Sequence, residues 1–181
     1  MAYNRHGSPS GGKRDFIHKY GIRRCKLRKE GDDFFQFAGN QSHKTVEQLP
    51  LQKTVGWAYV AHEDGFVLAE DAHRILENAK KANPESAKRI LIGGKVTVTE
   101  EAARVFAEAK IDLLGNESQT VGPEDSPMQV HLTLLGAEVV LLEGIRLGDV
   151  PTGVYLLSAA PLSLAGSDGA PCRAVLMELW K

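Results

Sequence analysis

Apolar residues along the middle of the chain follow two alternating spacings, one typical of strands and one typical of helices. Segment 54–61 alternates large apolar residues with smaller ones, which predicts a strand. Segment 68–82 repeats its apolar residues at helical spacing, and Asn83-Pro84 ends this predicted helix. This pairing of a strand with a helix is the first sign of a layered domain.

The same alternation continues further along the chain. Segment 89–92 is a short apolar run that Gly93-Gly94 breaks, and it predicts a second strand. Thr97 to Glu100 fits a capping box, and Thr99 followed by two glutamates is a good helix start. We therefore expect a helix that runs to Lys110 and leads into a buried strand at 111–114.

The C-terminal part of the chain reads as strands and turns. We expect a turn at 149–153, a strand at 154–160 with 161–165 beside it, a loop at 166–171 and a closing strand at 172–179. Strands and helices alternate in the middle, and the end is all strand. The pattern predicts an α/β or α+β domain with a mixed sheet.

The segment 116–144 carries the most informative chemistry. A polar loop, Glu117 to Asp125, precedes a short apolar helix that has His131 in its first turns and ends at Gly136. A buried strand at 139–142 follows and ends on Glu143.

The lengths of this helix and strand place two of these side chains together. From His131 to the helix end the chain advances roughly 8 Å, and the returning strand covers roughly 20 Å. Glu143 can therefore come level with, or pass, the N-terminal end of the helix that carries His131. An imidazole and a carboxylate so placed can bind a divalent metal, although a histidine on a short helix is more often satisfied in the core or at the surface.

Length and composition indicate one domain with a tail. The chain has 181 residues and a net charge of −1, and we expect a flexible tail at 1–20 and a folded domain at 21–181. No apolar run is long enough to span a membrane, and the first residues lack a signal-peptide core. The two cysteines fit no metal or redox spacing, so we expect reduced thiols in a cytoplasmic protein.

One basic stretch, 13–29, contains Phe16 and Tyr20 among its lysines and arginines. A basic arm with aromatic residues can follow a phosphate backbone. A solvated face or an edge strand is the alternative, and the near-zero net charge favours it. We therefore expect neither nucleic acid nor a membrane as a partner.

Four stretches carry a resemblance to a known family. They are Thr45-Val46 with Leu49 to Leu51, the helix TEEAARVFAEAKIDLLG, the run LLGAEVVLLEGIRL together with His131, and the tail VPTGVYLLSAAPLSLAGSDGAPCRAVL. In these stretches the chain resembles the cyclase, or kynurenine formamidase-like, metal-dependent hydrolases. The likeness runs from Thr45 onward and covers roughly three quarters of the chain.

The resemblance implies a swivelling β/α/β-type fold around a mixed, barrel-like sheet, usually in homo-oligomers such as dimers or tetramers. It also implies hydrolysis of an amide C–N bond in a small molecule, such as a formamide or a cyclic amide. Zn²⁺ or Mn²⁺ would activate the water, and the better-known members act on N-formylkynurenine. His131 and Glu143 match two of the family's metal ligands. Glu117 matches a carboxylate that could orient those ligands without binding the metal itself.

The chain departs from the family at its main metal motif, His-x-Gly-Thr-His-x-Asp-x-Pro-x-His. The corresponding stretch, 29–39, reads KEGDDFFQFAG and retains only Gly31. Asp33 stands at the second histidine and is the residue there that could still ligate a metal. Two hypotheses follow: a metal-dependent amide hydrolase, or an inactive relative that uses the fold for binding or assembly.

Overall fold

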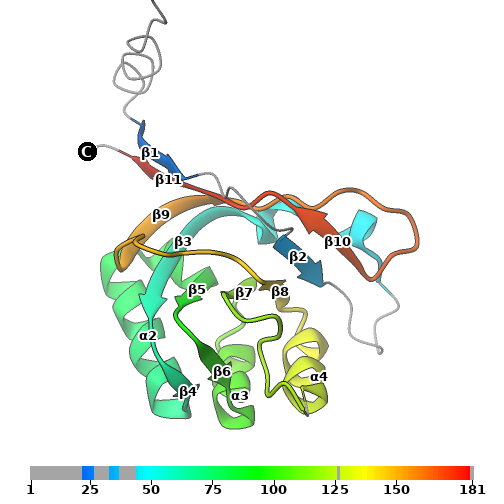
Figure 1. The fold of residues 1–181 in the computed structure, drawn as a ribbon, viewed down its shortest axis with the longest axis horizontal. Coiled ribbons are helices and arrows are strands. Elements are labelled where there is room, and N and C mark those ends of the chain that lie inside the picture. Colours follow the sequence, from blue (N-terminus) through cyan, green and yellow to red (C-terminus); the bar gives the residue numbers. More distant parts are fainter. Residues whose placement is uncertain (1–21, 27–32, 37–43, 126, 180–181) are drawn as a thin grey trace, which may run out of the picture.

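The computed structural model describes residues 22–26, 33–36, 44–125 and 127–179, and most of its strands form a mixed sheet with the α-helices on one face (Figure 1). The sheet has nine strands in the order β1-β11-β9-β3-β5-β7-β8-β2-β10. Its strands are β1 Ile22–Lys26, β2 Asp33–Gln36, β3 Val55–His62, β5 Arg89–Gly93, β7 Leu113–Asn116, β8 Val140–Glu143, β9 Gly153–Ser158, β10 Gly169–Cys172 and β11 Val175–Leu179. The predicted mixed sheet is confirmed.

Among the described residues, three α-helices connect the central strands: α2 Ala69–Ala82, α3 Glu100–Glu108 and α4 Met128–Gly136. Short 3₁₀ turns lie at Val46–Gln48, Leu51–Lys53 and Pro84–Lys88, and a separate pair of strands is formed by β4 Gly65–Val67 and β6 Val96–Val98. The helix predicted from Thr99 begins as expected, because the Thr99 hydroxyl accepts from the Ala102 N–H at 3.3 Å.

The middle of the sheet is parallel and its flanks are antiparallel. Strands β3, β5, β7 and β8 run in the same direction, whereas β9 pairs antiparallel with β3 and β2 pairs antiparallel with β8. Parallel strands are covered on both faces, which explains their nearly continuous apolar sequence. Their carboxyl ends gather at one edge of the sheet, which is where ligands bind in open α/β sheets.

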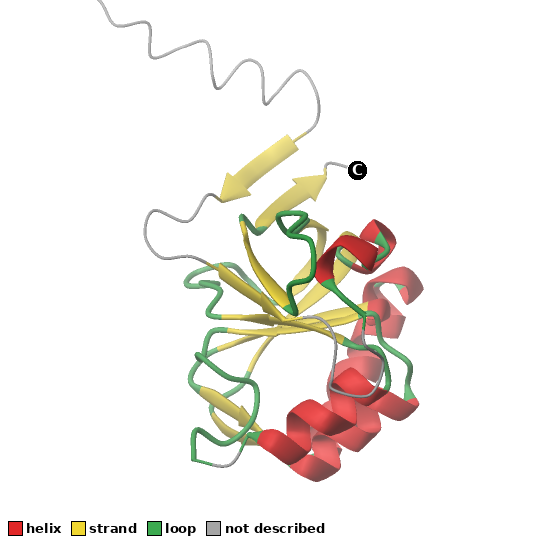
Figure 2. Ribbon diagram, turned by 90° about the vertical axis from the view of Figure 1, so that its right-hand side faces the viewer, coloured by secondary structure: helices red, strands yellow, loops and turns green. Residues whose placement is uncertain are grey.

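Apolar residues form a core on each face of the sheet. The larger core lies between the sheet and the three helices, which stand together on one side (Figure 2), and Phe106, Ile75 and Leu134 are buried in it. The second core includes Leu91, Leu142 and Leu157 on the opposite face. The sheet is therefore covered on both faces at its centre.

The sheet curls toward itself at its edge. Strand β10 pairs with β2 on one side, and Cys172 forms an antiparallel bridge to Pro161, which follows β9. The N–H of Leu162 also donates to the carbonyl oxygen of Pro171 at 3.2 Å. These contacts hold β10 beside the segment that follows β9, and the barrel-like closure expected of the sheet stays a prediction.

Three predictions for the C-terminal segment were wrong. The expected closing strand at 172–179 is two strands, β10 and β11, and residues 169–171 belong to β10 rather than to a loop. Segment 161–165 contributes only the bridge at Pro161. The chain must change direction between the two strands because β10 pairs with β2, whereas β11 pairs with β9 and β1. The predicted tail at 1–20 lies outside the described residues.

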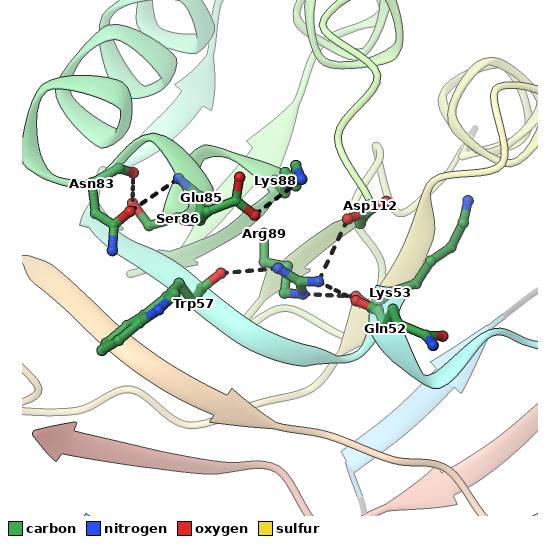
Figure 3. A network of polar contacts seen from close by, with 9 residues as sticks. All are labelled: Gln52, Lys53, Trp57, Asn83, Glu85, Ser86, Lys88, Arg89 and Asp112. Carbon is green, nitrogen blue, oxygen red and sulfur yellow. Dashed lines mark hydrogen bonds and ion pairs between the residues drawn. The ribbon is translucent and has the colours of Figure 1, made fainter.

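The buried side chain of Arg89, at the start of β5, holds the turn before β3 and the first part of β3 in place (Figure 3). Arg89 is 6% exposed, and its guanidinium donates to the carbonyl oxygens of Gln52, Lys53 and Trp57. It also lies 3.5 Å from the carboxylate of Asp112. Burial lowers the pKa of Arg89 against the opposing effect of Asp112. These four partners offset the cost of removing a guanidinium from water.

Within the described part of the chain, no helix is both long enough and apolar enough to cross a membrane.

Candidate active site

Helix α4 and strand β8 position the two residues that the sequence singled out. The helix ends at Gly136, as predicted, but Glu138 rather than the glycine adopts the left-handed backbone (φ 60°) that reverses the chain. Strand β8 then returns beside the helix and ends at Glu143 at the carboxyl edge of the parallel strands. The predicted meeting of the two side chains is confirmed, because His131 Nε2 lies 3.1 Å from Glu143 Oε1.

Several hydrogen bonds fix this pair. The other imidazole nitrogen of His131, Nδ1, lies 2.9 Å from the carbonyl oxygen of Pro127, one turn earlier in the same helix. Glu143 is 3% exposed, and its Oε1 also accepts from the backbone N–H of Val121 at 2.9 Å. Both side chains are thereby held in one orientation by backbone groups.

The partners of His131 determine where its protons lie. A carbonyl oxygen can only accept, so Nδ1 must carry a hydrogen that it donates to Pro127. An ionised Glu143 also only accepts, so the contact at Nε2 requires a second hydrogen on the imidazole. The hydrogen bond to Glu143 raises the pKa of His131 above its usual value, by more than burial lowers it. The structure therefore favours a protonated imidazole at His131, which donates to the Glu143 carboxylate.

A pocket of about 430 Å³ opens directly onto this pair. It is lined by Gln119, Thr120, Pro127, Met128, His131 and Glu143. This volume falls within the range of small-molecule sites, roughly 300–1,000 Å³. Polar groups from the loop after β7 lie on one side, and Pro127 and Met128 give an apolar side. The arrangement suits a small ligand with one polar and one apolar part.

His131 and Glu143 are suitable types of ligand for a divalent metal, but two ligands are fewer than a catalytic metal usually has. Imidazole nitrogen and carboxylate oxygen are both good ligands for Zn²⁺ and Mn²⁺. A catalytic metal usually has three protein ligands. Among the side chains described in residues 44–125 and 127–178, no group of three or more His, Cys, Asp or Glu is placed to hold an ion. The described residues therefore do not complete a catalytic metal centre.

Asp33 was the third residue predicted as a metal ligand. Its backbone lies in β2, where the next residue, Phe34, pairs with Glu143 of β8. The main chain of Asp33 is thus close to the site, but its side chain lies outside the described residues. Its role as a ligand remains a prediction.

Glu117 was predicted to support the metal ligands, and the structure gives it other partners. Its carboxylate accepts from the backbone N–H groups of Gly94 and Leu147, each at 2.8 Å. Burial would raise the pKa of Glu117, but these amides, with Gly148 and Arg146, outweigh it and the pKa is lowered. Glu117 thus joins the loop after β7 to the loops after β5 and β8. Neither His131 nor Glu143 is among these partners.

Sequence reasoning missed the loop residues that complete the pocket. Asn116 is fully buried at the end of β7, and its Nδ2 donates to the carbonyl oxygen of Thr120 at 3.0 Å. Val121 then holds Glu143 through its N–H. The available signal was that Asn116 lies two residues after the predicted buried strand at 111–114, where a polar residue marks the carboxyl edge of the sheet.

Comparison with known proteins places the chain in a family. It is 39% identical over 157 residues to a kynurenine formamidase of Salinibacter ruber, a match that covers 75% of this chain and 68% of the relative. It is 35% identical over 83 residues to a kynurenine formamidase of Sphingopyxis alaskensis, covering 45% of this chain and 40% of that relative. Comparison with models of protein families gives no match.

The fold agrees with this result. A solved structure described as a potential metal-dependent hydrolase with cyclase activity superposes with a TM-score of 0.69 at 23% identity, covering 87% of this chain and 88% of that one. At this identity the likeness shows the fold alone. The sequence match over most of the Salinibacter ruber protein shows that the chain belongs to the kynurenine formamidase family.

Proposed function

We propose that this chain hydrolyses the amide C–N bond of a small molecule, either a formamide or a cyclic amide, in the pocket beside His131 and Glu143. The observation that carries the proposal is the buried imidazole–carboxylate contact of 3.1 Å at the wall of that pocket. The similarity of the chain to kynurenine formamidases supports the choice of an amide as the substrate.

Amide hydrolysis needs a group that can accept and return a proton. The oxygen of water forms a bond to the carbonyl carbon, the C–N bond breaks, and one water proton ends on the departing nitrogen. For a formamide the products are formate and an amine. A positioned side chain that carries this proton contributes typically 10²–10⁴-fold to the rate.

His131 and Glu143 are suited to this task. Pro127 fixes the Nδ1 hydrogen, so proton exchange with the pocket takes place on the Nε2 side of the ring. The neighbouring carboxylate favours the protonated imidazole, as the raised pKa of His131 indicates. The pair can therefore hold a proton from water and release it to the amine nitrogen.

A divalent cation, Zn²⁺ or Mn²⁺, is part of the proposal. When bound, it would replace the proton at Nε2 of His131 and be held in part by that nitrogen and by the carboxylate of Glu143, which would then carry the transferred proton; its chemistry would be that of a Lewis acid toward the amide carbonyl. Its remaining donors would come from outside the described side chains, where Asp33 is the sequence candidate. Assembly into homo-oligomers stays a prediction.

A second candidate function is an inactive relative that keeps the fold for binding or assembly. The observation that favours it is the small number of metal donors, since the described residues supply only two around the pocket. A cation held by two protein ligands binds weakly and exchanges readily.

One experiment separates the two functions. The purified chain would be supplied with formanilide, an aryl formamide, after dialysis against chelator and after addition of Zn²⁺ or Mn²⁺. The hydrolase proposal predicts formate release that rises at least about tenfold with one of the metals, together with stoichiometric metal by elemental analysis. An absence of both formate release and bound metal, for formanilide and for a cyclic amide such as isatin, would establish the inactive relative.

A further inference from the structure

Gln119 is a pocket residue whose polar side chain the described part of the fold leaves unused. It is exposed to solvent, it lines the pocket beside His131, and its carboxamide forms no hydrogen bond with a described residue. A carboxamide carries two N–H donors and one acceptor oxygen. Gln119 therefore supplies both kinds of hydrogen-bonding group at the wall of the site.

The backbone on either side of Gln119 is fixed. The carbonyl oxygen of Ser118 accepts from the N–H of Gly144 at 2.9 Å. The carbonyl oxygen of Thr120 accepts from Asn116 Nδ2 at 3.0 Å. These contacts hold the main chain of Gln119 at the pocket, while its side chain remains free to turn toward a ligand.

The other polar groups of the pocket are already paired or are hidden from a ligand. Both imidazole nitrogens of His131 lie against acceptor oxygens of the protein. The hydroxyl of Thr120 is buried from solvent, so it offers no donor at the surface of the pocket. An ionised Glu143 only accepts, and the remaining two lining side chains, a proline and a methionine, carry no donor. Among the lining side chains, Gln119 is therefore the donor that a ligand oxygen can reach.

The two polar groups of a carboxamide match the two polar groups of a secondary amide, which presents a carbonyl acceptor and an N–H donor. In a small cyclic amide both groups lie on the same side of the C–N bond, so one carboxamide can bond to both at once. In an open-chain secondary amide the favoured trans form places them on opposite sides, and the cis form costs free energy. A carboxamide that binds both groups therefore favours a cyclic amide.

We propose that Gln119 is a specificity-determining residue that binds the amide group of a cyclic amide through both of its polar atoms. Its Nε2 donates to the substrate carbonyl oxygen, and its Oε1 accepts from the substrate N–H. A carbonyl oxygen has two lone pairs, so this hydrogen bond leaves one for other groups of the site. The inference rests on the proposed function, because it takes the ligand to be an amide, and it selects the cyclic amide from the two substrate classes proposed there.

A cycle of two ligands and two proteins tests this pairing. The ligands are isatin, a cyclic amide with an N–H, and N-methylisatin, which lacks that hydrogen. The proteins are the wild-type chain and Gln119→Leu, under the metal conditions of the hydrolysis assay. We would measure kcat/KM where the ligand is hydrolysed and the dissociation constant by calorimetry where it is not. The penalty of N-methylation is a ratio within one protein, so differences in reactivity between the two ligands cancel when the proteins are compared.

The pairing predicts a penalty that depends on Gln119. We expect N-methylation to weaken the wild-type interaction about tenfold, which corresponds to about 1.4 kcal/mol, and to change that of Gln119→Leu less than about twofold. Gln119→Ala should give the same result, which would exclude the bulk of leucine as the cause.

Gln129→Leu is the matched control. Gln129 is exposed on α4 and does not line the pocket, so this variant should keep the wild-type penalty. Because the replaced side chains are exposed, each variant should unfold within about two degrees of the wild-type Tm.

The outcomes distinguish this inference from the proposed function. A penalty in Gln119→Leu within about twofold of the wild-type penalty overturns the pairing, and so does a penalty lost equally in Gln129→Leu. Hydrolysis of isatin without this coupling removes the role of Gln119 and leaves the proposed function standing. Binding without hydrolysis, with the expected coupling, overturns the function and supports the role of Gln119. If the wild-type chain neither binds nor hydrolyses isatin, the role of Gln119 is overturned, and formanilide alone then decides the proposed function.

Discussion

Replacing Glu143 with glutamine removes one negative charge from the centre of the proposed site while keeping the size of the side chain. Glu143 is 3% exposed, and its Oε1 accepts from Val121 and faces Nε2 of His131. A glutamine oxygen can still accept from the Val121 N–H, but it cannot stabilise an imidazolium as a carboxylate does. The variant therefore isolates the charge of the pair.

The size and sign of the effect follow from the hydrogen bond to His131. A hydrogen bond between charged groups contributes about 1.5–3 kcal/mol. The pKa of His131 is raised in the folded chain above its ordinary value of 6.5, so the stabilisation is fully present below that value. It is lost as the pH rises through the folded pKa. Glu143→Gln should therefore cost about 1.5–3 kcal/mol at pH 5.5 and clearly less at pH 8.5.

Urea unfolding at the two pH values measures this difference, and an NMR titration of His131 gives the pKa directly. We expect the pKa of His131 to fall toward 6.5 in the variant. A loss of unfolding free energy that is the same at pH 5.5 and pH 8.5 would show that Glu143 does not stabilise a protonated His131, and this prediction would be wrong.

Three further substitutions probe the surroundings of the site. Gly122→Ala would place its Cβ 3.1 Å from Val130 at the start of α4, so we expect the helix to shift and the hydrolysis rate to fall about tenfold or more with little loss of fold by circular dichroism. Arg89→Met leaves three backbone carbonyls without their buried donor, and we expect a loss of about 3–5 kcal/mol in urea unfolding. Glu117→Gln should cost about 1–3 kcal/mol at pH 7; because the pKa of Glu117 is lowered in the folded chain, this difference should shrink as the pH falls below 4.5, as unfolding at pH 3.5 would show.

The central elements of the fold could be predicted because their patterns are local. Helix α3 has a threonine cap and a regular apolar face, and strand β8 is an uninterrupted apolar run. The edge strands could not be predicted in this way. Gly169–Cys172 contains glycine and proline, and it is a strand only because β2, more than 130 residues earlier, pairs with it.

The same difference between local patterns and distant contacts explains which parts of the candidate site could be predicted. The contact between His131 and Glu143 followed from the rise of a helix and of a strand, because one tight turn joins the two elements. The position of Thr120 did not follow from any periodicity. It depends on a loop conformation held by Asn116 and Glu143, which are contacts between separate strand ends.

The most direct test of the account is the effect of His131→Asn on formanilide hydrolysis, measured as kcat/KM beside the control His73→Asn. His73 is exposed on α2 and does not line the pocket. If His131 acts in the reaction, as a proton carrier or as a metal ligand, its substitution should lower kcat/KM at least about 100-fold, and the control should change it less than about twofold. Hydrolysis that survives in His131→Asn at the wild-type rate would contradict the placement of the reaction at this pocket.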